Sequence, residues 1–128
     1  MKSLVINTES DSPYYPGVLF NAENGICEIT GESYMEEAYK FYLPLINWIK
    51  EFIINEKRTL ELNFKLIYFN TSSSRLILDI LDMLKKFRDE GYDVTVNWHF
   101  DPDDPDVKDE VEDFEIESGM DINLVEME

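Results

Sequence analysis

A run of amide and hydroxyl side chains, Asn70-Thr71-Ser72-Ser73-Ser74, stands between an apolar strand pattern and an apolar helix pattern. Asn70 and Thr71 are the candidates for the helix N-cap, because a short side-chain oxygen accepts hydrogen bonds from the free amides of a first helical turn. The N-terminus of a helix also favours a negatively charged group such as phosphate. The run is therefore a place where a phosphate can be positioned and held.

The strand before this run is predicted over residues 59–69. Apolar side chains occupy every second position, namely Leu60, Leu62, Phe64, Leu66 and Tyr68. Alternation of this kind indicates a strand with one buried face. Ile67 and Phe69 make both faces apolar near the end, which predicts that the strand ends deep inside the sheet.

The helix after the run is predicted to extend to Arg88. Its apolar stripe has helical spacing and consists of Leu76, Ile77, Ile80, Leu81, Leu84 and Phe87. Three cations in the last turn suit the helix dipole, and Gly91 follows as a stop signal. This element must position the hydroxyl run against the core.

Wheel positions separate the polar residues of this helix. At 100° per residue, Ser73 falls on the buried stripe, whereas four other residues share the opposite side. These four are Thr71, Arg75, Leu78 and Asp82. One interpretation is a partner-binding face that includes Leu78 and Asp82. The other is that Thr71 only caps the helix and Leu78 is an ordinary exposed leucine, and the pattern alone favours this second interpretation.

The remaining elements are predicted from similar patterns. Before the hydroxyl run these are a short edge strand at Leu4–Ile6, a turn-rich segment at 12–17, a hairpin of residues 18–22 and 26–29 around Asn24-Gly25, and a helix that begins at a Ser33–Glu36 capping box. Pro44 predicts a kink or a break of this helix near Tyr42, and the continued apolar stripe favours a kink. After the hydroxyl run come a strand at 93–100, an acidic helix from Asp106 and a last strand at 122–127.

Apart from the edge strand, the predicted order is β-β-α-β-α-β-α-β. Strands that alternate with helices indicate an α/β fold, with a mixed β-sheet and helices packed on it. A chain of 128 residues buries roughly two thirds of its unfolded surface, which is enough for one core. We therefore expect a single domain over residues 1–128.

These residues resemble the SiaC family of bacterial regulatory phosphoproteins. The similarity runs through FYLPLINWIKEF, LIYFNTSSSRLILDILDMLKKF and VTVNWHFDPDD, and the N-T-S-S between strand and helix is its most specific part. The resemblance implies a fold like the STAS domain of anti-sigma-factor antagonists. It also implies phosphorylation of Thr71, with Asn70, Ser72, Ser73 and Arg75 around the phosphate.

The resemblance further implies a set of protein partners. A dedicated protein kinase adds the phosphate to Thr71, and a PP2C-like phosphatase removes it. The unphosphorylated form binds a diguanylate cyclase with a GGDEF domain and promotes its activity, so cyclic-di-GMP output and biofilm behaviour follow the switch. The resemblance implies no enzymatic activity of this chain itself.

Charge and composition weigh against several classes of function. A net charge of −17 repels nucleic-acid phosphate and anionic lipid, so neither a nucleic acid nor a membrane is an expected partner. No signal sequence or membrane-spanning run is present, and the expected compartment is the cytoplasm. The single cysteine, Cys27, is expected to be a buried structural thiol.

Recognised catalytic and metal-binding patterns are missing from the sequence. His99 is the only histidine, which argues against a transition-metal site and against a Ser-His-acid triad. The acidic run at 101–106 lacks the glycine of a calcium loop. No cofactor and no metal ion are therefore expected.

Two other functions remain open at this point. An anti-sigma-factor antagonist would share the phosphorylation switch, but its partner would be a kinase that inhibits a sigma factor. A small-ligand-binding domain or enzyme would use a pocket near the Asn70 turn.

Overall fold

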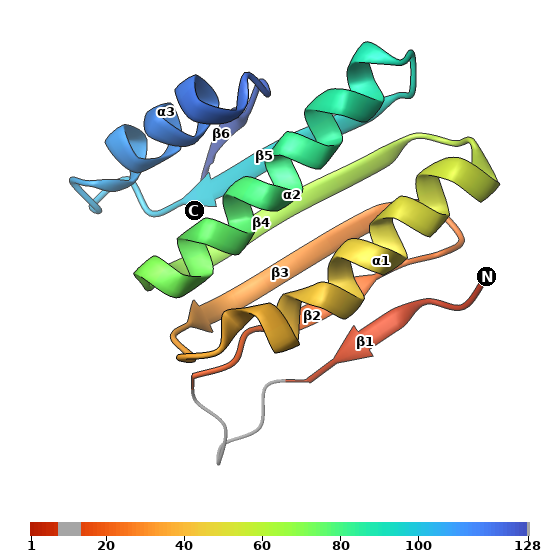
Figure 1. Ribbon diagram of the computed structural model, residues 1–128. Helices are drawn as coiled ribbons and strands as arrows, with labels where there is room; N and C mark the ends of the chain where they lie inside the picture. The colour runs from red at the N-terminus through yellow and green to blue at the C-terminus, as the bar shows by residue number, and fades with distance from the viewer. Residues whose placement is uncertain (8–13, 128) are drawn as a thin grey trace.

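Six strands form one mixed sheet in which each strand lies beside its neighbours in the sequence (Figure 1). The computed structural model describes residues 1–7 and 14–127, so the first residues of the predicted turn segment, Ser12 and Pro13, lie outside the described part. The strands are β1 (Leu4–Ile6), β2 (Gly17–Phe20), β3 (Ile26–Ser33), β4 (Leu60–Phe69), β5 (Val94–Phe100) and β6 (Asn123–Glu126).

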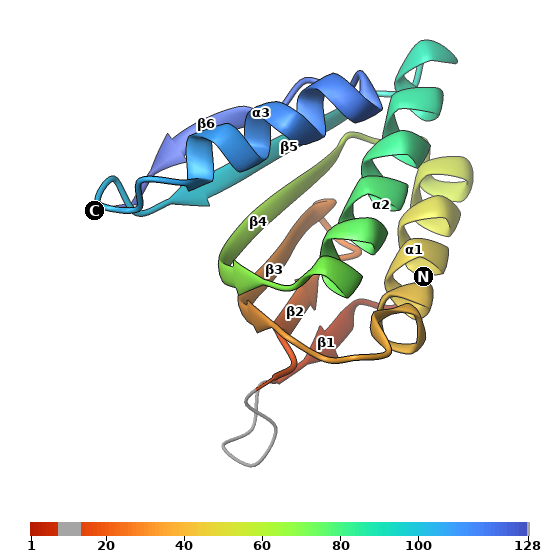
Figure 2. The same ribbon diagram turned by 60° about the vertical axis from the view of Figure 1, so that its left-hand side comes forward.

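Three helices connect the parallel strands and lie on the same face of the sheet (Figures 1 and 2). They are α1 (Ala38–Glu56), α2 (Thr71–Asp89) and α3 (Val107–Ser118). The β1–β2 and β2–β3 pairs are antiparallel, whereas β3, β4, β5 and β6 run parallel to one another. The predicted α/β order is confirmed, and the expected edge strand Leu4–Ile6 precedes it as β1.

The core lies between the sheet and the helices, and the predicted apolar stripes supply it. The stripe of α2 is buried apart from Phe87, which packs against the core at its edge. Trp98 of β5 is fully buried and stacks on Phe64 of β4, with ring centroids 4.7 Å apart. The predicted inward residues of α3 are also buried, namely Val107, Val111 and Phe114.

The start of α1 differs from the prediction. Ser33 belongs to the end of β3, and the helix begins five residues later, at Ala38. The Ser33–Glu36 capping box is therefore wrong, because the hydroxyl of Ser33 is engaged in long-range contacts inside the core. The helix continues through Pro44 without a break, and this proline is exposed to solvent.

The end of β4 also differs from the prediction. Gly31 of β3 pairs with Leu66, but the next residue, Glu32, pairs with Tyr68, so Ile67 is an extra residue on β4. A bulge of this kind changes the face to which the following side chains point. Ile67 is 71% exposed and Tyr68 is 48% exposed, so the strand does not end deep inside the sheet.

The sheet splits between β4 and β5 before β4 reaches this bulge. Their pairing ends at Phe64 and Trp98, and β5 then continues beside β6 alone. Figure 2 shows β5, β6 and α3 diverging from the end of β4. The chain therefore leaves β4 into α2 at an edge that β5 does not cover.

The opposite face of the sheet carries a row of hydrogen-bonded polar side chains. Asn63 Oδ1 accepts hydrogen bonds from Asn97 Nδ2 at 3.1 Å and from His99 Nε2 at 2.9 Å. Asn97 in turn accepts from Asn123 at 3.0 Å. Partial burial and the charge of Lys65 lower the pKa of His99, so this ring is neutral near pH 7. None of the three helices covers this open face.

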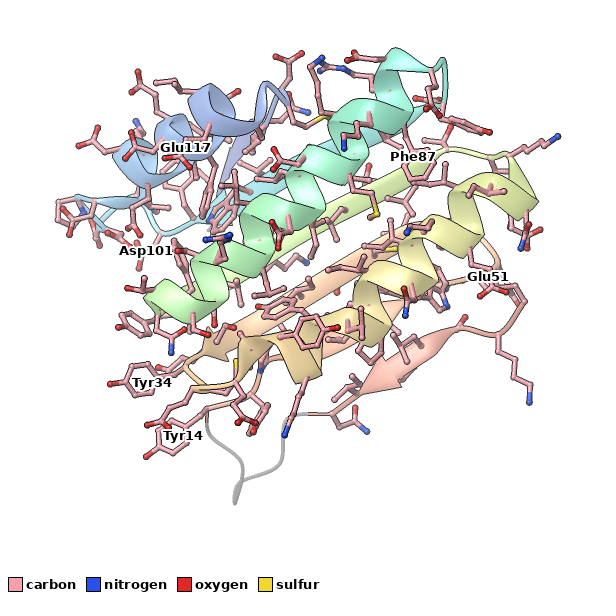
Figure 3. The ribbon with its side chains drawn as sticks, viewed as in Figure 1. Tyr14, Tyr34, Glu51, Phe87, Asp101 and Glu117 are labelled. Carbon is pink, nitrogen blue, oxygen red and sulfur yellow. The ribbon has the colours of Figure 1, made fainter. Side chains whose placement is uncertain are left out.

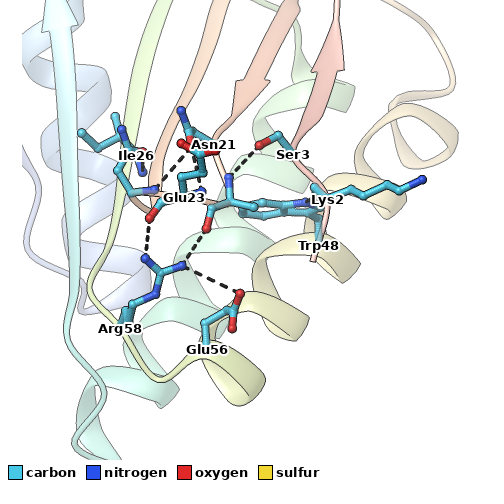
Figure 4. A network of polar contacts seen from close by, with 10 residues as sticks. Lys2, Ser3, Asn21, Glu23, Ile26, Trp48, Glu56 and Arg58 are labelled. Carbon is cyan, nitrogen blue, oxygen red and sulfur yellow. Dashed lines mark hydrogen bonds and ion pairs between the residues drawn. The ribbon is translucent and has the colours of Figure 1, made fainter.

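A second polar network fixes the hairpin and the N-terminal strand to the end of α1 (Figure 4). The guanidinium of Arg58 donates to the carbonyl oxygens of Glu23 and Ala22, the second at 2.6 Å. Trp48 Nε1 donates to the carbonyl oxygen of Lys2 at 2.8 Å. This network lies at the end of the helices remote from the hydroxyl run.

Cys27 is a buried structural thiol, as predicted. Its side chain is fully inaccessible to solvent. Burial, assisted by the nearby charge of Glu61, raises the pKa of the thiol to about 12. The thiolate that reacts with electrophiles is therefore scarce in the native state.

We expect Gly25→Ala to lower the free energy of unfolding by roughly 3 kcal/mol or more, since it combines backbone strain with overpacking. Gly25 has φ +74°, and an added Cβ would meet the carbonyl oxygen of Thr59 and the ring of Phe52. Gly91→Ala is the matched control, because Gly91 has φ +100° with no atom within 4 Å of an added Cβ. This control should lose only about 1–2 kcal/mol. Equal losses in urea denaturation would contradict the packing assigned to Gly25.

Candidate functional site

The turn from β4 into α2 is capped by Asn70. Its side-chain oxygen accepts a hydrogen bond from the amide of Ser73 at 2.9 Å, which decides between the two predicted N-cap residues. Thr71 is then the first residue of the helix. A residue at this position lies at the positive end of the helix dipole.

Three members of the N-T-S-S run bind the segment 33–38, which connects β3 to α1. The Asn70 side chain donates to the carbonyl oxygen of Met35 at 3.0 Å. Ser72 Oγ donates to the carbonyl oxygen of Glu36 at 2.9 Å and accepts from the amide of Ala38 at 3.4 Å. Because α1 has no side-chain cap of its own, Ser72 supplies one from the neighbouring helix.

Ser73 is fully buried, as its wheel position predicted. Its hydroxyl donates to the carbonyl oxygen of Ser33 at 3.0 Å and accepts from the Ser33 hydroxyl at 2.7 Å. The Tyr42 hydroxyl lies 2.7 Å from Ser33 Oγ and completes the chain as a donor. Burial raises the pKa of Tyr42 to about 12, although its hydrogen bond with Ser33 acts in the opposite direction, so this phenol keeps its proton.

Thr71 differs from its three neighbours. Its side chain is exposed, and its hydroxyl makes no hydrogen bond within the described part of the chain. Asn70, Ser72 and Ser73 thus hold the backbone, while the Thr71 hydroxyl points to solvent from a fixed position. The Thr71 hydroxyl is therefore accessible at the surface without unfolding of the turn.

Two depressions meet at Thr71. The first, here called the tyrosine hollow, has a volume of about 900 Å³ and lies between α2 and the segment 33–38. The second, here called the acidic groove, has a volume of about 600 Å³ and lies between α2 and α3. Among the described residues, Thr71 alone lines both of them.

Four tyrosines line the tyrosine hollow, namely Tyr14, Tyr15, Tyr34 and Tyr68. The rings of Tyr14 and Tyr34 lie 5.6 Å apart, and those of Tyr34 and Tyr68 lie 5.3 Å apart. Figure 3 shows Tyr14 and Tyr34 side by side, pointing outward. Glu36 and Glu37 complete the rim with two carboxylates.

The acidic groove contains the face predicted from the helical wheel. Thr71, Arg75, Leu78 and Asp82 all line it. Leu78 is only partly exposed, because it packs at the edge of the core beside α3. The interpretation of Leu78 as an ordinary exposed leucine is therefore wrong, whereas its part in partner binding stays a prediction.

Helix α3 supplies the opposite wall of the groove. Its contribution consists of Glu110, Asp113, Phe114 and Glu117. Partial burial, together with the charges of Asp104 and Asp106, raises the pKa of Glu110. Arg75 is the cation of this groove and makes no ion pair with any described residue. The groove therefore combines an apolar floor with a strongly negative rim.

Sequence patterns did not reveal the tyrosine hollow or the α3 wall. The tyrosines come from three segments that are distant in the sequence, and only the path of the chain after β3 and the bulge in β4 bring them together. The inward stripe of α3 was predicted, but its outward carboxylates could not be assigned to a groove without the position of α2. The signal that would have revealed the hollow is the cluster of tyrosines near the N-T-S-S run, and this cluster forms only when the chain is folded.

Comparison with known proteins identifies the family. The model of the SiaC family, described as a regulatory phosphoprotein family, matches residues 8–127. This chain belongs to the SiaC family. An uncharacterized protein of Pseudomonas aeruginosa strain UCBPP-PA14 is 35% identical over 86 residues, which are 67% of this chain and 68% of that protein.

Solved structures of SiaC share the fold of this family member. The crystal structure of apo-SiaC from Pseudomonas aeruginosa superimposes with a TM-score of 0.87 at 29% identity, covering 98% of this chain and 99% of that one. SiaC in complex with the diguanylate cyclase SiaD, which it activates, has a TM-score of 0.88 at 28% identity, covering 97% and 99%. The predicted family and α/β fold are confirmed.

Residues 1–7 and 14–127 are the part of the chain that the structure describes. No helix in this part of the chain is long and apolar enough to cross a membrane. Its His, Cys, Asp and Glu side chains form no group of three suited to hold a metal ion.

We expect Ser73→Ala to lower the free energy of unfolding by roughly 1–3 kcal/mol, because it leaves the buried Ser33 hydroxyl without its acceptor. Ser74→Ala is the matched control. Ser74 is half-exposed, its hydroxyl donates only to the Thr71 carbonyl at 3.0 Å, and the change should stay within about 0.5 kcal/mol. Urea denaturation of both variants measures the difference, and equal effects would argue against the buried network.

Proposed function

We propose that this SiaC family member is a non-enzymatic regulatory protein of the cytoplasm that is switched by reversible phosphorylation of Thr71. In the unphosphorylated state it binds a GGDEF diguanylate cyclase and promotes its activity. The observation that carries the proposal is the exposed Thr71 hydroxyl inside a turn whose other polar side chains are all engaged. SiaC from Pseudomonas aeruginosa has the same fold as this chain and is the activator of the diguanylate cyclase SiaD, which supports this choice of partner.

A dedicated protein kinase and a PP2C-like phosphatase act on Thr71 in this proposal. Both enzymes need an acceptor group that they can reach without unfolding the chain, and the exposed first residue of α2 satisfies this requirement. Ser73 is unsuited to modification because its hydroxyl is fully buried. Ser72 is committed to Glu36 and Ala38.

The phosphate would change the surface and leave the fold in place. It adds about −1.5 to −2 charges at the N-terminus of α2, where the helix dipole favours an anion. Arg75 lies one turn further along the same face and is the cation best placed to hold it. The hydrogen bonds of Asn70, Ser72 and Ser73 to the segment 33–38 do not involve the Thr71 side chain, so phosphorylation need not break them.

A partner that covers Thr71 would then meet a buried dianion. Arg75 carries one positive charge and cannot balance a dianion by itself. Burying the unpaired charge is costly, and the surrounding carboxylates of the acidic groove add repulsion. The partner-binding residues proposed here are Leu78 and Asp82, which share the groove with Thr71. Binding is lost because the docking surface changes, without refolding.

The test compares three forms of residue 71 for binding to the cyclase. Thr71→Ala should bind as tightly as the unmodified protein, whereas the phosphorylated protein should bind at least roughly 30-fold more weakly, because an unpaired buried charge costs about 2–5 kcal/mol. Thr71→Asp should show a smaller loss, since one carboxylate imitates a phosphate poorly. Affinity capture from the native host identifies the cyclase, and titration calorimetry measures each affinity.

Asn47→Asp is the control for added charge, because Asn47 is an exposed residue of α1 that lines neither depression. It should bind like the wild type. Equal binding by the phosphorylated and unmodified proteins would contradict the switch. Capture of a histidine-kinase-like ATPase in place of a GGDEF protein would contradict the choice of partner and identify an anti-sigma-factor antagonist.

A further inference from the structure

The pattern of polarity around Thr71 indicates what kind of surface fits it. Tyr68 and Phe69, which directly precede the Asn70 cap in the chain, line the tyrosine hollow and the acidic groove respectively, and Leu78 also lines the groove. Carboxylates line both depressions as well, from the segment 33–38 on one side and from α3 on the other. This is the arrangement of a protein interface, with an apolar centre and a charged rim.

The aromatic half of this surface is built before any partner arrives. The rings of Tyr14, Tyr34 and Tyr68 are each about half exposed. The Tyr34 ring packs between the other two. The amide of Tyr34 donates to the carbonyl oxygen of Tyr14 at 2.8 Å, which joins the two segments. Tyrosines that are held in place lose little conformational entropy on binding, and they are frequent anchors of interfaces.

Carboxylates border both depressions. Glu36 and Glu37 border the tyrosine hollow, where Glu37 forms an exposed ion pair with Lys40 at 2.8 Å and Glu36 forms no ion pair with any described residue. On the far side, the α3 carboxylates of Glu110, Asp113 and Glu117 face the groove. A partner that covers both depressions must therefore carry cationic groups at its edges, because like charges across an interface cost binding energy.

We infer that the tyrosine hollow and the acidic groove form one docking surface centred on Thr71, and that it takes a partner segment with an apolar centre flanked by arginine or lysine on both sides. The inference rests on the proposed function for the identity of the partner, the diguanylate cyclase, but not for the chemistry of the surface. It extends the predicted face, which included only the groove.

This arrangement explains how one phosphate blocks the whole surface. The cationic side chains of the partner pair with the carboxylates at the two outer borders, whereas its apolar centre lies over Thr71. A phosphate at that point faces apolar groups that cannot compensate its charge. A phosphate at an outer border would instead meet the partner's cations and strengthen binding.

The aromatic half is tested by binding of the cyclase to Tyr34→Ala and Tyr68→Ala. Each should weaken binding roughly 30-fold, as expected for an aromatic anchor. The matched control is Tyr39→Ala, which removes a 60% exposed tyrosine of α1 that lines neither depression. Thermal denaturation checks that all three variants fold. Losses equal to that of the control would show that the partner uses the groove alone and would overturn the inference.

The charged half is tested by two double variants of α3 with the same net charge. Asp113→Asn with Glu117→Gln removes two groove carboxylates, and Asp109→Asn with Glu112→Gln removes two that do not line it. The first pair should weaken binding roughly tenfold and flatten its salt dependence, whereas the second should change it less than about twofold. Equal effects of the two pairs would mean that only the overall charge matters, which overturns the inference.

A synthetic peptide separates this inference from the choice of the cyclase. The probe is a helical peptide with a leucine stripe flanked by arginines, and its control has glutamate at each arginine. Chemical-shift mapping on the labelled protein should show changes at Tyr34, Tyr68 and Asp113 with the basic peptide only. If these shifts appear but no cyclase is captured, the surface stands and the proposed partner fails. Shifts confined to the open sheet face, near Thr95 and Asn97, or spread over all acidic residues, would overturn the surface itself.

Discussion

The hydrogen bonds between the Asn70–Ser73 turn and the segment 33–38 hold the site together. They connect the start of α2 to the chain that leads into α1, through the Asn70 and Ser72 side chains at the surface and through Ser73 in the core. Because every one of these groups is buried or already engaged, the backbone at Thr71 has little freedom. The exposed hydroxyl and the two depressions beside it follow from this constraint.

The same constraint separates the surface from the fold. The core between the sheet and the helices is complete without the Thr71 side chain, and the network around Arg58 secures the opposite end of the molecule. A charge added at Thr71 therefore acts on whatever docks there, while the packing beneath it stays as it is. In a regulatory protein this lets a single modification change partner choice at little cost to stability.

Much of the fold was predictable because local patterns decided it. The alternating apolar residues of β5 and the stripe of α2 pack in the structure as their periodicity predicts, and the burial of Ser73 followed from its position on that stripe. The predicted capping box at Ser33 was wrong because the Ser33 hydroxyl, which the local motif would use, is hydrogen-bonded to Tyr42 and Ser73 in the core. The prediction that β4 ends deep inside the sheet was wrong, because one extra residue, Ile67, changes the face to which Tyr68 points. No sequence pattern marks that bulge. The tyrosine hollow depends on this bulge, so it could not be predicted either.

Thr71 is the proposed phosphate acceptor, and the neighbouring Ser72 and Ser73 are not. Intact mass and peptide sequencing of the protein purified from its native host test this most directly. We expect a fraction of molecules to carry one phosphate, located on Thr71, with none on Ser72 or Ser73. A phosphate on either serine, or an unmodified chain under every growth condition, would contradict it.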